Sequence, residues 1–237
     1  MELTDKRELN ESSLDSLAIE FPEKKSLGEH VYKRLKQAII DGEMAAGSRI
    51  LETRIANSLG ISRTPVREAI HKLDRAGFLE QLPSGGFAVA GLTREGIEEI
   101  FGIRSILESY AARLATIKHK EDELRPLEDK LREFRTCVKK GQLDALSRIN
   151  TEFHDMLYTL SRSPRLIKMV GDLAEQVIRF RKILLDDKNM VKLIDHDHNM
   201  MLEAMKDRDL DRVEKLVKEH ILRGQKMVLK KFHFDIV

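Results

Sequence analysis

The sequence predicts a mainly α protein that consists of an N-terminal winged helix-turn-helix and a C-terminal all-α helical bundle. Charged residues make up 35% of the chain and aromatic residues 5%, with no tryptophan, and this composition suits amphipathic helices better than a β-sandwich. The predicted secondary structure also changes along the chain. Residues 26–90 combine short helical patterns with tight turns, whereas residues 93–237 contain long helical patterns with few helix-breaking residues. A length of 237 residues accommodates two modest domains.

Local patterns set the expected boundaries of these parts. Residues 1–25 show weak periodicity and scattered charge, which predicts a mobile arm or a short accessory helix. The winged helix-turn-helix domain is expected over residues 26–90 and the helical domain over residues 93–237. Gly91-Leu92-Thr93 is the expected joint, because Thr93 is a suitable N-cap for the long helix that follows.

Apolar spacing and glycine stops predict the first two helices. The first helix is predicted from one apolar stripe, which consists of Val31, Leu35, Ala38 and Ile39. Asp41-Gly42 ends this helix, and the chain turns at residues 46–48 before it re-enters the core at Ile50-Leu51. A second, short helix runs from about residue 52 to residue 59 and stops at Gly60.

A third helix and a β-hairpin complete the first domain. The helix begins at Ser62 or Thr64, with Pro65 in its first turn, where a missing N–H group costs nothing. Its inner stripe consists of Val66, Ala69, Ile70 and Leu73. Two short strands, residues 79–82 and 87–89, flank a turn of proline, serine and two glycines and form a hairpin. Two helices joined by a tight turn and followed by a hairpin make a winged helix-turn-helix.

The outward face of the third helix has the chemistry of DNA binding. With the apolar stripe buried, the helix presents Arg63, Thr64, Arg67 and His71. A helix N-terminus attracts phosphate, and arginine can hydrogen-bond guanine O6 and N7 in the major groove. The alternative is a solvated helix face that carries two arginines. Local charge gives weak support to DNA binding, since residues 26–90 contain nine Lys and Arg against seven Asp and Glu, a difference of +2.

One ordered stretch of the first domain resembles a known family. Residues 61–69, followed by Leu73 and Gly77-Phe78-Leu79, are similar to the GntR family of bacterial regulators. The resemblance extends from about residue 27 to residue 89. It implies that the domain binds DNA in a sequence-specific way.

The resemblance also implies which residues contact DNA. Those expected in the third helix, at the wing tip and in the second helix are Ser62, Arg63, Thr64, Arg67, Gly86 and Arg54. Arg63 and Arg67 are expected on bases or phosphates, and the two hydroxyl residues on phosphates. One departure concerns the second helix, where the family often has arginine directly after the first glutamate. Here that position is Thr53 and the arginine is Arg54, and one residue rotates a helical side chain by about 100°, so the operator preference is expected to differ.

Three histidines of the helical domain lie on the inner stripes of separate predicted helices. His154, His198 and His220 all point inward, whereas His196 faces elsewhere. Asn150 precedes His154 by four residues and is therefore its neighbour on one helix flank. A lone inward histidine is usually a satisfied core residue, but converging imidazoles in a bundle are a common way to bind a divalent transition metal.

The helical domain resembles the FCD effector domain of the FadR-type branch of the GntR family. The resemblance covers nearly all of residues 95–225 and rests on residues 100–104, Leu107-Glu108, Phe153-His154, Ala204, Asp207 and the other two histidines. It implies that His154, His198 and His220 hold a metal, which we expect to be zinc, nickel or manganese, and that Arg104 meets the carboxylate of a small organic acid. Asn150 stands where the family usually has aspartate, and a neutral amide oxygen is a weaker ligand. If the metal is absent, the pocket is expected to be a metal-free acid site.

These patterns together predict a cytoplasmic homodimer that binds a palindromic operator on double-stranded DNA and is controlled by a small organic acid, with repression as the default. The single cysteine excludes an internal disulfide, the N-terminal residues do not resemble a signal peptide, and no apolar run approaches the length of a membrane span. Two alternatives stay open. The histidines would also suit a metal-dependent enzyme, although no positioned general base accompanies them, and a non-specific architectural DNA-binding protein is disfavoured by a net charge of only +2.

Overall fold

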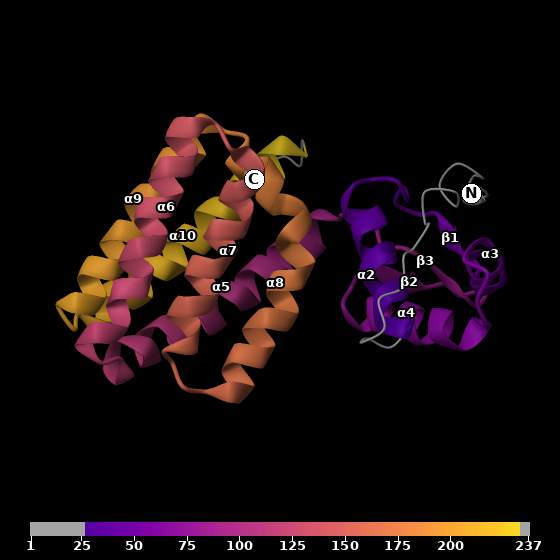
Figure 1. Cartoon of the computed structure of the whole chain (residues 1–237), viewed down its shortest axis with the longest axis horizontal. Coiled ribbons are helices and arrows are strands. Elements are labelled where there is room, and N and C mark those ends of the chain that lie inside the picture. The colour runs from indigo at the N-terminus through magenta and orange to yellow at the C-terminus, as the bar shows by residue number, and fades with distance from the viewer. Residues whose placement is uncertain (1–26, 233–237) are drawn as a thin grey trace. The chain divides into compact units, whose positions relative to one another are not determined.

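The computed structural model describes residues 27–232, apart from the side chains of residues 143, 144, 179 and 181–183. The chain divides into two compact units between Leu92 and Thr93, which are coloured indigo to magenta and magenta to yellow in Figure 1. The N-terminal arm expected over residues 1–25 lies outside the described residues. The predicted mainly α fold is confirmed, since helices form nearly all of the second unit and most of the first.

The first unit consists of three helices and a small antiparallel sheet. Its elements are α2 (Leu27–Ile40), β1 (Arg49–Ile50), α3 (Glu52–Ser58), α4 (Arg63–Arg75), β2 (Leu79–Gln81) and β3 (Phe87–Val89). The strand order is β1-β3-β2, with Arg49 opposite Ala88 and Leu79 opposite Val89. The sequence predicted only the β2–β3 hairpin, because a strand of two residues is too short to show the alternation by which strands are recognised.

One core holds the first unit together. The predicted stripe of α4 is buried at Val66, Ala69, Ile70 and Leu73, and it packs against the buried stripe of α2 in the same cluster. Gly60 and Gly77, the predicted helix stops, have positive φ values of 63° and 71°, which glycine adopts without steric cost. Ser62 is the N-cap of α4 but its side chain makes no capping hydrogen bond. The inner face of α4 is thus fixed, and its outer face is left to solvent.

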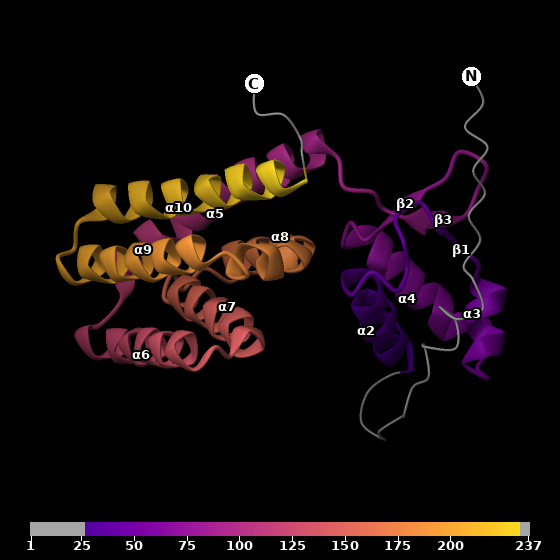
Figure 2. The same ribbon diagram turned by 90° about the horizontal axis from the view of Figure 1, so that it is seen from above.

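The second unit is entirely helical. Its elements are α5 (Arg94–Lys118), the 3-10 helix η1 (Glu121–Leu124), α6 (Arg125–Lys140), α7 (Leu143–Thr159), α8 (Pro164–Leu185), α9 (Lys188–Lys206) and α10 (Leu210–Lys231). Figure 2 shows three layers within it, with α5 and α10 on one side, α8 and α9 in the middle, and α6 and α7 on the other side. As predicted, Thr93 caps α5, and its Oγ1 accepts a hydrogen bond of 3.0 Å from the Gly96 N–H group.

Two arginines with left-handed backbones hold the C-terminal end of α5. Arg208 (φ 55°) donates from Nη2 to the His119 carbonyl at 2.7 Å and from Nη1 to the carbonyls of Thr116 and Ile117. Arg162 (φ 48°) donates to the Lys118 carbonyl at 2.8 Å. The last carbonyls of a helix have no partner within it, so these side chains supply the missing donors.

We expect Arg208→Ala to lower the free energy of unfolding by about 1–2 kcal/mol, because three carbonyl groups lose a charged donor while the left-handed backbone stays. Urea unfolding followed by circular dichroism measures the change. Arg132→Ala, on the exposed surface of α6, is the control and should change stability by less than about 0.5 kcal/mol. Equal stability of the two variants would show that the Arg208 contacts contribute nothing.

Candidate functional site

The N-terminal turn of α4 presents a cluster of polar and basic side chains. Burial of the apolar stripe forces Ser62, Arg63, Thr64 and Arg67 to the surface, and all four are exposed. Ser62 has an extended backbone (φ −69°, ψ 160°) and makes no side-chain cap, so N–H groups of the first turn remain available. Hydroxyl groups, guanidinium groups and N–H groups at one helix end are suited to phosphates and base edges.

A carboxylate of α3 connects the two arginines of this cluster. Glu52 Oε2 accepts hydrogen bonds from Arg63 Nη2 at 3.1 Å and from Arg67 Nη2 at 3.3 Å. Burial would raise the pKa of Glu52, but the hydrogen bonds from Arg63 and Arg67 outweigh it and hold that pKa below its usual value. The ionised carboxylate therefore orients both guanidinium groups. From the sequence, this glutamate marked only the start of a helix and had no predicted role.

The wing is braced by residues outside the hairpin. Gly85 and Gly86 at its tip are exposed and both have a φ of 85°. Arg49 of β1 donates from Nη2 to the Gly85 carbonyl at 3.1 Å. His71 of α4 meets the Phe87 ring of β3 edge-on at 5.5 Å, so His71 is an exposed residue that joins α4 to the wing. The predicted contact residue Arg54 is exposed on α3.

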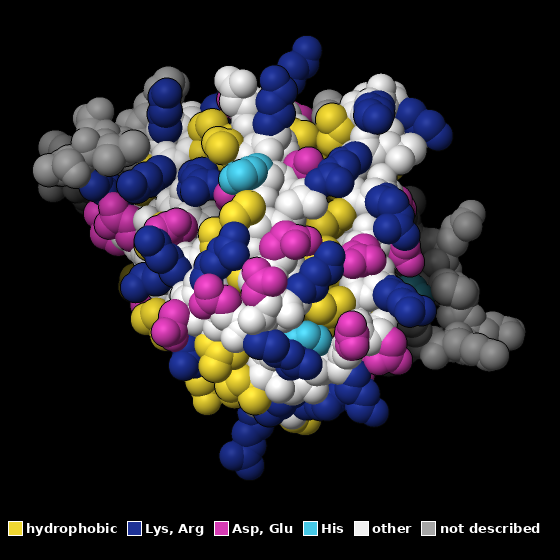
Figure 3. Space-filling view, turned by 90° about the vertical axis from the view of Figure 1, so that its left-hand side faces the viewer, with side chains coloured by type: hydrophobic (Ala, Val, Ile, Leu, Met, Phe, Trp, Pro, Cys, Tyr) yellow, Lys and Arg dark blue, Asp and Glu magenta, His cyan; other side chains and the backbone are white. Residues whose placement is uncertain are grey.

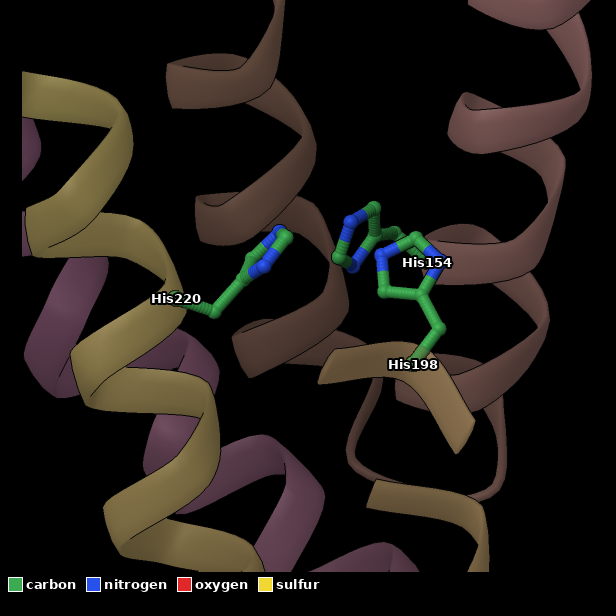
Figure 4. Close-up of side chains that lie close together, drawn as sticks. All are labelled: His154, His198 and His220. Carbon is green, nitrogen blue, oxygen red and sulfur yellow. The ribbon is translucent and has the colours of Figure 1, made fainter. Parts of the chain in front are cut away.

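The second unit brings its three predicted histidines together. His154 of α7, His198 of α9 and His220 of α10 point toward one another in Figure 4, and each offers a nitrogen within 4.8 Å of those of the other two. His154 and His198 are buried, and the His220 side chain is 12% exposed. His196 is exposed, as its predicted face requires. Three helix stripes thus converge on one point.

Hydrogen bonds orient two of the imidazoles. The Tyr158 hydroxyl donates to Glu108, so it accepts a hydrogen bond of 3.1 Å from His154 Nδ1–H. His220 Nδ1 lies 3.0 Å from Asp197 Oδ2, a carboxylate that also accepts from Arg223. Engagement of Nδ1 leaves Nε2 of each ring for a ligand, and such outer partners are usual for metal-binding histidines.

Two further polar atoms in this region are buried without a hydrogen-bond partner among the described residues: Nε2 of His198 and Oδ1 of Asn150. The Phe153 ring stacks on His198 with centroids 4.2 Å apart. Burial, followed by the nearby charge of His220, holds the pKa of His198 well below its usual value. His198 is therefore neutral, which is the form that binds a metal. Buried polar atoms are rarely left unpaired, so this donor set fits a divalent cation.

A cavity of about 50 Å³ lies beside three of these four residues and the predicted effector contact, whereas His198 does not line it. Asn150, His154 and His220 line it together with Arg104 and apolar side chains of α8, α9 and α10. The Arg104 guanidinium is buried and donates from Nε to Glu108 Oε1 at 2.6 Å. Arg104 therefore lies where it was expected, but its charge is already paired. A chain of hydrogen bonds runs from Arg104 through Glu108 and Tyr158 to His154.

The partners that orient the imidazoles were not predicted from the sequence. Tyr158 follows His154 by four residues and Asp197 directly precedes His198. The four-residue spacing was the available signal for Tyr158, since residues four apart on a helix are neighbours. Asp197 pairs with His220 of another helix, and only the packing of α9 on α10 brings those two together.

Two family matches cover almost the whole described chain. Residues 27–89 match the bacterial regulatory proteins of the gntR family, and residues 99–223 match the FCD domain. The chain belongs to the GntR family of bacterial regulators. Its relatives include the uncharacterized HTH-type transcriptional regulator YdhC of Bacillus subtilis, which is 32% identical over 193 residues (81% of this chain and 84% of the relative). The HTH-type transcriptional repressor RspR of Escherichia coli is 25% identical over 195 residues (82% and 86%).

Solved structures agree with this assignment. Escherichia coli McbR/YncC has a TM-score of 0.69 with 25% identity, over 88% of this GntR chain and 99% of that chain. The protein is therefore a DNA-binding transcription regulator of the GntR and FCD type, and its relatives do not support the enzyme alternative raised by the histidines.

The surface charge and hydropathy of this GntR protein are unremarkable. On the face drawn in Figure 3, basic and acidic side chains are interspersed, in keeping with a net charge of +2. No helix among residues 27–232 is both long enough and apolar enough to cross a membrane.

Proposed function

We propose that this GntR protein is a cytoplasmic, homodimeric repressor that leaves its operator when a small carboxylate metabolite binds in the helical unit. Repression is supported by two relatives, the Escherichia coli repressor RspR and the probable D-xylose utilization operon transcriptional repressor of Paenarthrobacter nicotinovorans. Two recognition helices related by a two-fold axis match a palindromic operator.

On DNA, the N-terminal residues of α4 enter the major groove. Arg63 and Arg67 contact base edges or phosphates, and Ser62 and Thr64 contact phosphates. Arg54 of α3 and Gly86 of the wing approach the backbone. These roles are supported by the exposure of all six residues and by the family match over residues 27–89. The Glu52 bridge adds that the two arginines are already oriented before DNA binds.

The observation that carries the effector proposal is the shared cavity, which is lined by His154, His220, Asn150 and Arg104. His198 does not line it, but its ring nitrogen lies within 4.8 Å of those of the other two histidines. His154, His198, His220 and Asn150 would hold zinc, nickel or manganese. All four donors are neutral, so no direct ligand would offset the charge of a divalent ion, and an open coordination position would attract an anion. A carboxylate is such an anion, and the guanidinium group of Arg104, whose Nε is bonded to Glu108, lines the same cavity. The cavity volume of about 50 Å³ favours an acid of a few carbon atoms.

DNA binding and effector binding are then linked, and each lowers the affinity for the other by the same factor. The test begins with selection of bound sequences from random double-stranded DNA, which should return a palindrome. The affinity for that sequence is then measured with a set of small carboxylic acids, with and without each of the three metals. One acid should weaken DNA binding by about 10-fold to 100-fold in the presence of metal.

Each part of the proposed function can be contradicted by a separate result. Selection without any preferred sequence would contradict the operator. An acid that acts equally without metal would keep the regulator and remove the metal from the site. If no acid changes DNA affinity under any condition, the effector proposal is wrong. If the acid instead tightens DNA binding, the effector is a co-repressor, and repression requires the acid rather than being relieved by it.

A further inference from the structure

The wing carries no charge of its own. Residues 81–93, which include β3 and the exposed tip at Gly85 and Gly86, contain no charged side chain. Contacts to phosphates supply a large share of the affinity of DNA-binding proteins, and arginine and lysine make many of them. A wing that approaches the DNA backbone therefore needs a cation from another element of the first unit.

Arg49 places a guanidinium group at this tip. It belongs to β1, which pairs with β3 (Figure 1) so that Arg49 lies opposite Ala88. From there the side chain reaches the tip, where Nη2 donates to the Gly85 carbonyl at 3.1 Å. The backbone next to it is held as well, since the Val89 N–H group donates to the Ser48 carbonyl at 2.9 Å. The guanidinium group is therefore positioned before DNA binds, which lowers the cost of forming a contact.

Most N–H groups of Arg49 have no partner in the described part of the chain. The bond to Gly85 is the only hydrogen bond that Arg49 makes there, although a guanidinium group can donate several. Its Nε is buried, and buried polar atoms are rarely left unpaired. Arg63 and Arg67 share the carboxylate of Glu52, whereas no described carboxylate pairs with Arg49. The charge of Arg49 is thus left for an anion from outside the chain.

Gly86 keeps the space beside this guanidinium group open. Its φ is 85°, a conformation that glycine adopts without steric cost. A Cβ atom at this position would lie 3.9 Å from both Nε and Nη2 of Arg49, so a larger side chain would fill the space that a ligand could use. A phosphate suits this space, because arginine can donate parallel hydrogen bonds to two of its oxygens.

We propose that Arg49 and the wing tip form a phosphate-binding site, in which the guanidinium group of Arg49 contacts a phosphodiester of the DNA backbone beside Gly86. The ligand is a phosphate rather than a base edge, because the bond to the Gly85 carbonyl holds the guanidinium group against the wing and keeps it from extending into a groove. This inference deepens the proposed function and rests on it only for the approach of the wing to DNA.

The salt dependence of DNA affinity tests the contact. Anisotropy of the full chain is measured with the selected operator and with a scrambled duplex, between about 50 and about 200 mM salt. Arg49→Gln should weaken both complexes by about 10-fold, and should reduce the slope of log affinity against log salt by about 0.9 for each Arg49 that contacts DNA. Arg49→Lys keeps the charge and should keep the slope. Arg75→Ala, which removes an exposed arginine from the last turn of α4, is the matched control and should also keep it.

Neutral linkages in the DNA separate a phosphate contact from a purely structural role in the wing. Methylphosphonates, introduced one at a time, remove the charge of single phosphates without changing the protein. At one position the replacement should weaken the wild type and Arg75→Ala but not Arg49→Gln, because the two changes remove the same interaction. Circular dichroism melting shows that each variant is folded.

Three results would each overturn the inference. An unchanged salt slope in Arg49→Gln would leave Arg49 as a brace of the wing. A loss confined to the operator would indicate a base contact. The absence of any linkage that couples to Arg49 would exclude a phosphate as its partner. The scrambled duplex does not depend on operator selection, so failure of the operator proposal remains distinguishable from failure of this contact.

Discussion

His198→Gln should weaken the binding of a divalent metal by at least about 100-fold, since loss of an outer partner alone costs 10-fold to 100-fold. His198 is the most buried of the three histidines, at 1% exposure, and its Nε2 has no hydrogen-bond partner among the described residues. Glutamine retains a polar side chain of similar length but lacks an imidazole nitrogen at that position. Metal content of the purified protein and calorimetric titration with zinc, nickel and manganese measure the loss.

His196→Gln is the matched control, because it makes the same exchange two residues away on the exposed face of α9. It should leave metal affinity unchanged. Thermal unfolding provides a second readout: metal at 100 times its dissociation constant should stabilise the wild type by about 2.7 kcal/mol, and His198→Gln should lose that increment. If both variants bind metal like the wild type, the triad is a set of packed core histidines.

The inner faces of the helices could be predicted because apolar spacing reports burial directly. The stripe of α4 and the convergence of three histidines both follow from positions three and four residues apart. The spacing also explains why the predicted exposed side of α4 agrees with the structure. Apolar spacing gives the position of a residue on its own helix. In this chain it was therefore sufficient to predict which side chains of a helix are buried and which are exposed.

Contacts between different helices and strands could not be predicted from sequence spacing. Glu52 bridges to α4 from α3, and Asp197 of α9 pairs with His220 of α10, but neither contact has a fixed sequence spacing. The two-residue strand β1 forms only because β3 lies beside it.

Arg67→Ala should weaken binding to the selected operator by about 10-fold to 100-fold, the cost of one arginine contact to a base pair. Arg67 is exposed in α4, and its side chain makes no buried contact that would unfold the helix. Fluorescence anisotropy with the operator and with a scrambled duplex separates specific from general affinity. Arg75→Ala, in the last turn of the same helix, is the control and should have little effect, because recognition helices contact bases from their N-terminal residues.

Glu52→Gln distinguishes a base contact by Arg67 from simple attraction of positive charge to DNA. This variant keeps both arginines but removes the carboxylate that orients them and one negative charge near the phosphates. It should therefore bind scrambled DNA more tightly and discriminate the operator less well, whereas Arg67→Ala loses operator affinity more than scrambled affinity. If Arg67→Ala weakens both duplexes equally and reduces the salt dependence by about one phosphate contact, Arg67 binds the backbone and base recognition must come from another residue.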